Sequence, residues 1–320
     1  MKFVKIATSA DNISIFASDE SFVSFGDSPY FSHYTCSAVD IYPGKRGFNT
    51  VVSAYSPVSG VIKEIHKIKP PQRKSFEKVD YVISIAPEES SKFVVRLLHV
   101  KPTLSVGDRV DVGDTLGHII RSGYYDFWTD PHVHVEIRSK YKKILIARGS
   151  EKIIPNIQEP ISFSAKTRLC QSLVGKITKV TSEYILLNIS DYASVIKPFY
   201  GISIGTSNSV VLLDAGIPYY QYGIIVHLGA LDVPIEALPF DTNISRIITD
   251  NFIHSINLSN VDLPPTRGIG TALYLKKENL QCKLVLAQHK HGEQSSINLE
   301  SYLGEKISFS ICIKNKVYFE

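Results

Sequence analysis

The chain lacks the features that mark several large classes of protein. Its four cysteines are dispersed without a CxxC pair, which favours free, mostly buried thiols and a reducing compartment. No apolar run is long enough to span a membrane, and residues 1–20 hold no apolar stretch of signal-peptide length. We therefore expect a cytoplasmic chain with neither a membrane span nor a secretion signal.

Charge of one sign is also scarce. The chain has 35 Lys and Arg residues against 31 Asp and Glu residues, a formal net charge of +4 at pH 7. No basic block and no basic stripe with interleaved aromatics occurs, so nucleic acid is not expected as a partner. A hydrophobic content of 44% in 320 residues is ordinary for a soluble globular protein, and this length favours two domains over one.

Few stretches repeat apolar residues at helical spacing, and residues 233–250 come nearest. Short apolar or alternating runs instead follow one another, separated by Gly, Pro, Asp and Ser, as in Tyr81–Ala86 and Phe93–Val100. This pattern predicts an all-β protein. Two prolines and several charges interrupt it between Arg148 and Pro160. We therefore expect one domain at 1–150, a linker at 151–163 and a second β-rich domain at 164–320.

The segment DPHVHVEIR, residues 130–138, is the most informative in the chain. Side chains alternate along a strand, so His132 and His134 point to one face and the intervening Val133 to the other. The two imidazoles could share a metal, or divide into one ligand and one catalytic base. Two exposed histidines on an ordinary strand are the alternative.

Three further residues suggest that these histidines have partners. His33 lies in a Ser/Tyr/Thr-rich segment, Asp40 lies inside the strand-like run Ala38–Tyr42, and His99 closes an apolar strand. Burying an unpaired carboxylate is costly, so Asp40 needs a partner, for which a metal or an ordinary cation would serve. Two histidines and a carboxylate form a familiar zinc ligand set that leaves one position open for water. The two remaining histidines could then handle protons.

In order and context these segments resemble the lysostaphin-like zinc metallopeptidases, whose domain is called the duplicated hybrid motif or LytM domain. Tyr55–Ile62 resembles the hairpin entry of that family, and Gly107–Gly117 resembles its recurring Gly-Asp turn. The same turn occurs in lipoyl-like and glucose-permease-type barrels, so it indicates fold and not activity. The resemblance covers about residues 30–140 and implies a hybrid barrel-sandwich domain, which a second β-rich domain would follow.

The resemblance also implies roles for the five polar residues. His33, Asp40 and His134 would bind zinc, and His99 and His132 would be catalytic. A zinc-activated water would then cleave a peptide or peptide-like substrate. Family members typically cut cross-linking peptides of cell walls. That work needs secretion, so the substrate is left open here. The chain has no HExxH helix, which excludes thermolysin-like chemistry.

One spacing departs from the family pattern. Its first His and Asp usually lie four residues apart, whereas His33 and Asp40 lie seven apart. The extra residues could loop out and return both side chains to one metal, or they could displace His33. Glu136 shares the face of His134 and could accept a hydrogen bond from an imidazole, or pair with a nearby Arg. The aromatic residues of 122–131 could form the wall of a substrate cleft or cover the barrel end.

Two other functions compete with the hydrolase. The same fold could serve as a non-catalytic metal- or ligand-binding module, or as a phosphocarrier that uses paired histidines. The second half shows no resemblance that we can name, and we expect it to govern substrate access. Its own HxH motif, His289 and His291, has polar neighbours typical of an exposed loop, so no metal site is predicted there.

Overall fold

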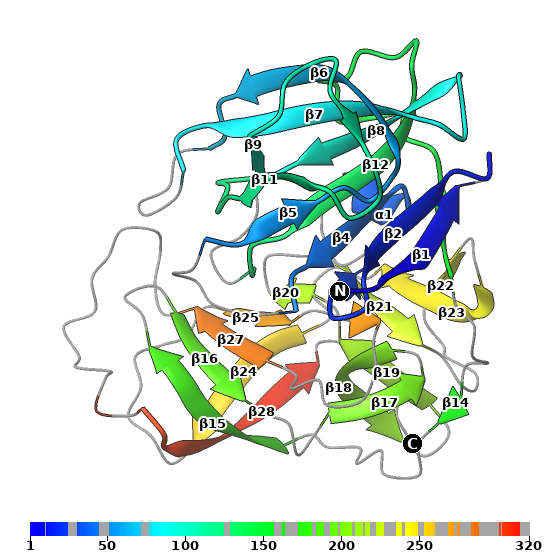
Figure 1. The fold of residues 1–320 in the computed structure, drawn as a ribbon. Helices are drawn as coiled ribbons and strands as arrows, with labels where there is room; N and C mark the ends of the chain where they lie inside the picture. Colours follow the sequence, from blue (N-terminus) through cyan, green and yellow to red (C-terminus); the bar gives the residue numbers. More distant parts are fainter. Residues whose placement is uncertain are drawn as a thin grey trace. The chain divides into compact units, whose positions relative to one another are not determined.

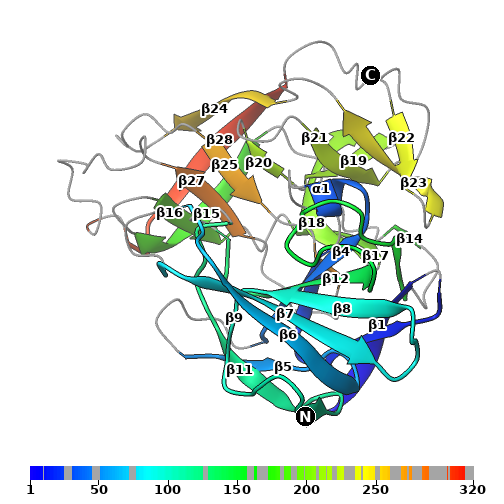
Figure 2. The ribbon, with the colours of Figure 1, turned by 90° about the horizontal axis from the view of Figure 1, so that it is seen from above.

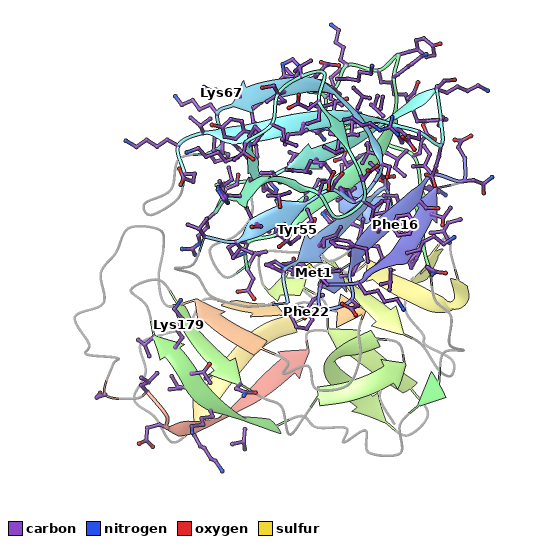
Figure 3. All side chains as sticks on the ribbon, in the orientation of Figure 1. Met1, Phe16, Phe22, Tyr55, Lys67 and Lys179 are labelled. Carbon is purple, nitrogen blue, oxygen red and sulfur yellow. The ribbon has the colours of Figure 1, made fainter. Side chains whose placement is uncertain are left out.

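A computed structural model describes residues 1–9, 11–24, 31–44, 51–71, 77–124 and 129–156. Beyond residue 156 it describes mainly the backbone of the strands, with few side chains (Figure 3). The protein is all-β, and the one helix in the described part of the chain, α1 (Phe31–Tyr34), is a single turn (Figures 1 and 2). No described helix is long and apolar enough to cross a membrane.

The chain divides near residue 158 into two compact units. The first unit contains three antiparallel sheets. Their strands are β1 (Phe3–Ser9), β2 (Ser14–Ser18), β3 (Phe22–Ser24), β4 (Ala38–Tyr42), β5 (Ser53–Tyr55), β6 (Gly60–Ile68), β7 (Asp80–Pro87), β8 (Phe93–Leu98), β9 (Val100–Pro102), β10 (Arg109–Val110), β11 (Thr115–Ile119), β12 (Val133–Ser139) and β13 (Ile153–Pro155).

The main sheet of this unit runs in the order β10-β6-β7-β8-β12-β4-β3. Its central strands are buried on both faces, which explains their nearly continuous apolar sequences. One face carries aliphatic side chains in register, such as Ile83, Leu97 and Val135, all at most 1% exposed. The opposite face carries the polar residues of β4, β8 and β12. The fold therefore places a row of buried polar side chains in the centre of this sheet.

Two smaller sheets complete the unit, in the orders β5-β11-β9 and β13-β1-β2. The Gly-Asp turns expected at 107–117 are present between β9 and β11. Asp108 and Asp114 each accept a hydrogen bond from the backbone N–H three residues earlier, at 2.8 Å. Gly113 has a φ of +93°, and a Cβ there would meet the ring of Phe3. Strand β13 lies in the segment expected to be a linker, yet it pairs with β1.

The second unit is β-rich along its described backbone. Its strands are β14 (Ser162–Phe163), β15 (Ser172–Val180), β16 (Tyr184–Asn188), β17 (Ala193–Lys197), β18 (Phe199–Thr206), β19 (Ser209–Leu213), β20 (Ala215–Ile217), β21 (Tyr222–Val226), β22 (Ile235–Leu238), β23 (Asp241–Ile248), β24 (Ile253–Ser259), β25 (Gly268–Thr271), β26 (Tyr274–Leu275), β27 (Lys283–Ala287) and β28 (Lys306–Ile313).

One sheet of the second unit runs β20-β25-β27-β16-β15-β28-β24, another runs β21-β23-β22, and β26, β18, β17 and β14 follow one another with β19 also on β18. Within residues 233–250, the nearest approach to a helical pattern, β22 and β23 form an antiparallel pair.

Candidate metal centre

The unusual spacing between His33 and Asp40 is taken up by helix α1. His33 lies on this single turn, which ends in a Schellman motif. The N–H of Ser37 donates to the carbonyl of Ser32 at 2.7 Å, and the N–H of Cys36 donates to that of His33 at 3.0 Å. Cys36 adopts the left-handed conformation that this motif requires, with a φ of +53°. The extra residues thus form a closed turn that directs the chain into β4.

Asp40 and His134 are brought together by strand pairing. They are direct partners in the register of β4 and β12. Side chains of cross-strand partners lie on the same face of a sheet, close enough to interact. The Oδ1 atom of Asp40 lies 2.9 Å from Nδ1 of His134. Both residues come from regular strands, so the backbone holds this pair rigidly.

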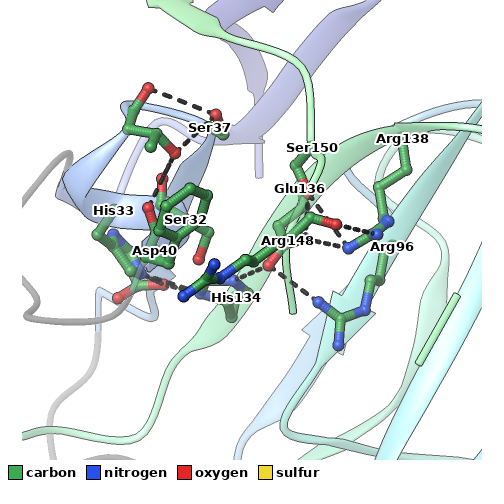
Figure 4. A network of polar contacts seen from close by, with 12 residues as sticks. Ser32, His33, Ser37, Asp40, Arg96, His134, Glu136, Arg138, Arg148 and Ser150 are labelled. Carbon is green, nitrogen blue, oxygen red and sulfur yellow. Dashed lines mark hydrogen bonds and ion pairs between the residues drawn. The ribbon is translucent and has the colours of Figure 1, made fainter. Parts of the chain in front are cut away.

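His33 completes a group of three donor atoms (Figure 4). Its Nε2 atom lies 3.0 Å from His134 Nδ1 and 3.3 Å from Asp40 Oδ1. Zinc bonds of about 2.0–2.2 Å at tetrahedral angles separate ligand atoms by about 3.3–3.6 Å. The triangle is slightly tighter than that, so a small outward movement would admit the ion.

The chemistry of the donors also fits a metal. His33 Nε2 and His134 Nδ1 face each other at 3.0 Å, a contact that needs either a proton on one of them or a cation that accepts both lone pairs. Burial alone would raise the pKa of Asp40. The nearby His132 and His33, with hydrogen bonds from His134 and His33, outweigh burial and hold this pKa well below its usual value. An ionised, buried carboxylate beside two imidazoles is a suitable ligand set for zinc.

Glu136 binds the other ring nitrogen of His134. Its Oε1 atom lies 2.9 Å from His134 Nε2, so Nδ1 is the nitrogen that faces His33 and Asp40. Burial alone would lower the pKa of His134, but hydrogen bonds to Asp40 and Glu136 outweigh it and raise the pKa to about 9. This arrangement holds the imidazole in one orientation, as carboxylates behind metal-bound histidines commonly do.

The sequence suggested that Glu136 either accepts a hydrogen bond from an imidazole or pairs with an Arg. It does both, because it also forms ion pairs with arginines (Figure 4). Arg96 Nη1 lies 2.9 Å from Oε1, and Arg138 Nη1 lies 3.3 Å from Oε2. The hydroxyl of Ser150 donates to Oε2 at 2.5 Å. Burial alone would raise the pKa of Glu136, but His134, Arg96 and Ser150 outweigh it, and the pKa falls far below its usual value. Glu136 is therefore a buried, ionised carboxylate that links His134 to Arg96 and Arg138.

His132 lies directly before β12 and faces the second oxygen of Asp40. Its Nε2 atom lies 3.4 Å from Asp40 Oδ2, and its Nδ1 donates to the carbonyl of Asp130 at 2.9 Å. A carbonyl only accepts, so Nδ1 carries the proton and Nε2 has a lone pair when the ring is neutral. Burial lowers the pKa of His132 to about 4, because it outweighs the opposing effect of Asp40.

His99 lies against the same group from the end of β8. Its ring centroid is 5.1 Å from that of His132 and 6.1 Å from that of His134. Its Nδ1 atom lies 2.7 Å from a carboxylate oxygen of Asp80. All five sequence-predicted residues therefore gather in one place. Their exposed fractions are between 2% and 7%.

Sequence reasoning missed Asp80 as part of this environment. The available signal was the one used for Asp40: a carboxylate beside an apolar run that needs a buried partner. Other sequence predictions fall outside the described residues. These are the aromatic segment at 125–128 and the second HxH motif, His289 and His291.

Comparisons with known proteins assign no function. A family described as "Domain of unknown function (DUF8155) N-terminal domain" matches residues 12–155. No curated protein matches the chain. A solved structure entitled "A Novel M23 Metalloprotease Pseudoalterin from Deep-sea" is 16% identical, with 47% of this chain and 75% of that chain covered and a TM-score of 0.27.

Proposed function

We propose that the first unit is a zinc-dependent metallohydrolase that cleaves peptide bonds, on the hybrid barrel-sandwich fold that its sequence resembles. The observation that carries this proposal is the donor triangle of His33, Asp40 and His134, with two further histidines beside it. A structural zinc site normally uses four protein ligands, whereas a catalytic site uses three and leaves a position for water. Three donors with two histidines beside them fit the catalytic type.

The proposed roles follow from the hydrogen bonds of each side chain. His33 Nε2, His134 Nδ1 and Asp40 Oδ1 would hold the ion, which would activate a water and polarise the scissile carbonyl. Asp40 Oδ2 faces His132, and Glu136 orients His134 through Nε2. His132 and His99 each have Nδ1 bound to an oxygen outside the triangle. Their Nε2 atoms are thus the ones that would exchange protons with water or substrate.

The substrate is proposed only as a class, a peptide or peptide-like molecule. We also propose that the second unit contributes to substrate recognition and not to chemistry. The metal-ligand cluster found among the described residues lies wholly in the first unit.

The test is metal analysis of the purified protein combined with a peptide-library hydrolysis assay. We expect close to one zinc ion per chain, hydrolysis that a chelator abolishes, and recovery when zinc is added back. His134→Ala is the inactive control for a contaminating peptidase. Protein without metal after growth in zinc-supplemented medium would contradict the metal site, and zinc-loaded protein inert towards every peptide would contradict the hydrolase.

A second candidate, a non-catalytic metal-binding module, is favoured by one observation. All five residues are almost completely buried, whereas a hydrolase must admit its substrate. Stoichiometric zinc without hydrolysis would support this candidate. The phosphocarrier alternative is disfavoured, because both ring nitrogens of His134 face carboxylates, which would repel a phosphoryl group.

A further inference from the structure

A second buried carboxylate lies beside the candidate metal centre. Asp80, the first residue of β7, is 0% exposed, and four hydrogen bonds converge on it. Its Oδ1 accepts from the backbone N–H groups of Tyr81 at 2.6 Å and His99 at 3.1 Å. Its Oδ2 accepts from the hydroxyl of Ser122 at 2.5 Å and from His99 Nδ1 at 2.7 Å. One carboxylate therefore binds both the main chain and the side chain of His99.

The charge of Asp80 determines which ring nitrogen of neutral His99 carries the proton. Burial alone would raise the pKa of Asp80, but His99 and the hydrogen bonds from Ser122 and Tyr81 outweigh burial and lower the pKa. An ionised carboxylate can only accept hydrogen bonds. The proton of neutral His99 must then be on Nδ1, which leaves the lone pair on Nε2.

The backbone of His99 is held in an uncommon conformation. Its φ is +68°, in the left-handed region, where β8 in the main sheet ends and β9 in a different sheet begins. Residues other than glycine are held there only when their surroundings enforce it, and such residues cluster at functional sites. The bond from the His99 N–H to Asp80 Oδ1 is one enforcing contact. A second is the bond from the Ile120 N–H to the His99 carbonyl, at 2.9 Å.

We propose that Asp80 is a positioning residue, which fixes both the left-handed backbone and the Nδ1–H tautomer of His99 and so turns Nε2 towards the candidate metal centre. The effect on turnover rests on the proposed hydrolase function, whereas the effect on the His99 tautomer does not. When Nε2 takes a proton from water or returns it to a leaving amine, Nδ1–H stays bonded to Asp80. The carboxylate stabilises the resulting imidazolium and is not itself protonated, as in other His-Asp pairs.

Asp80→Asn tests the proposal because the hydrogen-bond donors around this side chain fix how the new amide group must be oriented. Two backbone N–H groups occupy Oδ1, so the amide oxygen of Asn must take that place. The amide NH₂ then faces His99 Nδ1, and it can only donate. His99 is thereby forced into the Nε2–H tautomer, with its lone pair directed away from the metal centre.

The measurement is long-range ¹H–¹⁵N NMR of the zinc-loaded full chain labelled in its ten histidines, with His99→Gln for assignment. We expect the Nδ1–H tautomer for His99 in the wild type and the Nε2–H tautomer in Asp80→Asn. If the hydrolase proposal holds, Asp80→Asn lowers kcat by about 10²–10⁴-fold with little change in KM and unchanged zinc content. Asp111→Asn, in an exposed turn, is the matched control and leaves the tautomer and kcat unchanged.

Several outcomes would overturn the proposal. One is an Nε2–H tautomer of His99 in the wild type, which needs no variant and therefore decides the matter even if Asp80→Asn fails to fold. Another is a folded Asp80→Asn protein with an unchanged tautomer. A purely structural role would lower stability but leave the tautomer and the ratio of kcat to KM unaffected. Wild-type protein that binds zinc but hydrolyses no peptide would remove the hydrolase proposal, while the NMR comparison still decides the role of Asp80.

Discussion

Asp40 and His134 are cross-strand partners on β4 and β12, with Asp40 Oδ1 2.9 Å from His134 Nδ1. His134 therefore sits between two carboxylates, because Glu136 Oε1 lies 2.9 Å from its other nitrogen. This chain of Asp40, His134 and Glu136 links the candidate metal centre to the buried arginines. Each residue of this chain can be substituted separately, so its contribution to zinc binding can be measured by mutation.

The first prediction separates ligands from the other histidines. His134→Ala removes one of three proposed donors and should abolish zinc retention. His99→Ala and His132→Ala leave the triangle intact, so zinc should stay bound while turnover falls by about 10²–10⁴-fold. Metal analysis after gel filtration, together with peptide hydrolysis, measures both properties. Equal loss of zinc from all three variants would contradict this division of roles.

The second prediction concerns Glu136. Glu136→Gln removes the charge that orients His134, so zinc affinity should fall by about 10–100-fold. The change also leaves Arg96 and Arg138 without their buried counter-charge, which should lower the free energy of unfolding by about 3–5 kcal/mol. Competition with a fluorescent zinc chelator and denaturant titration of the metal-free protein measure the two effects.

Glu88→Gln is the matched control, because Glu88 forms an exposed ion pair with Arg109. Such pairs contribute about 0–1 kcal/mol, so both properties should stay near those of the wild type. If Glu136→Gln also kept the zinc affinity and the unfolding free energy of the wild type, the contacts of Glu136 with His134, Arg96 and Arg138 would have no role in maintaining the candidate metal centre.

The third prediction concerns the turn that carries His33. Cys36 has a φ of +53° at the end of α1, where a β-branched side chain is strongly disfavoured. Cys36→Val should destabilise the protein by about 1–3 kcal/mol and weaken zinc binding by displacing His33. Cys36→Ser, similar in size and unbranched at Cβ, should have a much smaller effect on zinc affinity. Equal zinc affinity of the two variants would mean that this turn does not position His33.

The fourth prediction is a pH dependence that arises from Asp80. Its pKa in the folded protein is lowered from 3.8, so its contribution to stability is complete above that value. The contribution is lost as the pH falls through the lower, folded-state pKa. The difference in unfolding free energy between the wild type and Asp80→Asn should thus shrink as the pH falls below about 4. A difference that grew in acid would have the wrong sign for this mechanism.

The local sequence was sufficient for the parts of the site that depend on strand periodicity. The alternation of β12 placed His134 and Glu136 on one face, and the apolar run around Asp40 indicated a buried carboxylate in need of a partner. The all-β class followed from the same short runs. These properties could be predicted because side-chain direction along a strand repeats every two residues, whatever the strand pairs with.

The remaining features depended on contacts between distant segments, and only the tertiary structure decided them. The spacing of His33 and Asp40 left open whether His33 was displaced, and helix α1 with the closing turn at Cys36 places it beside Asp40. Asp80 lies 19 residues before His99, and it meets that residue because β7 pairs with β8. Periodicity carries no information on which strands become neighbours, since pairing is chosen by the burial of the whole sheet. The sequence therefore determined which residues are chemically suited to a metal centre, and the strand pairing and the turn at Cys36 determined that they meet.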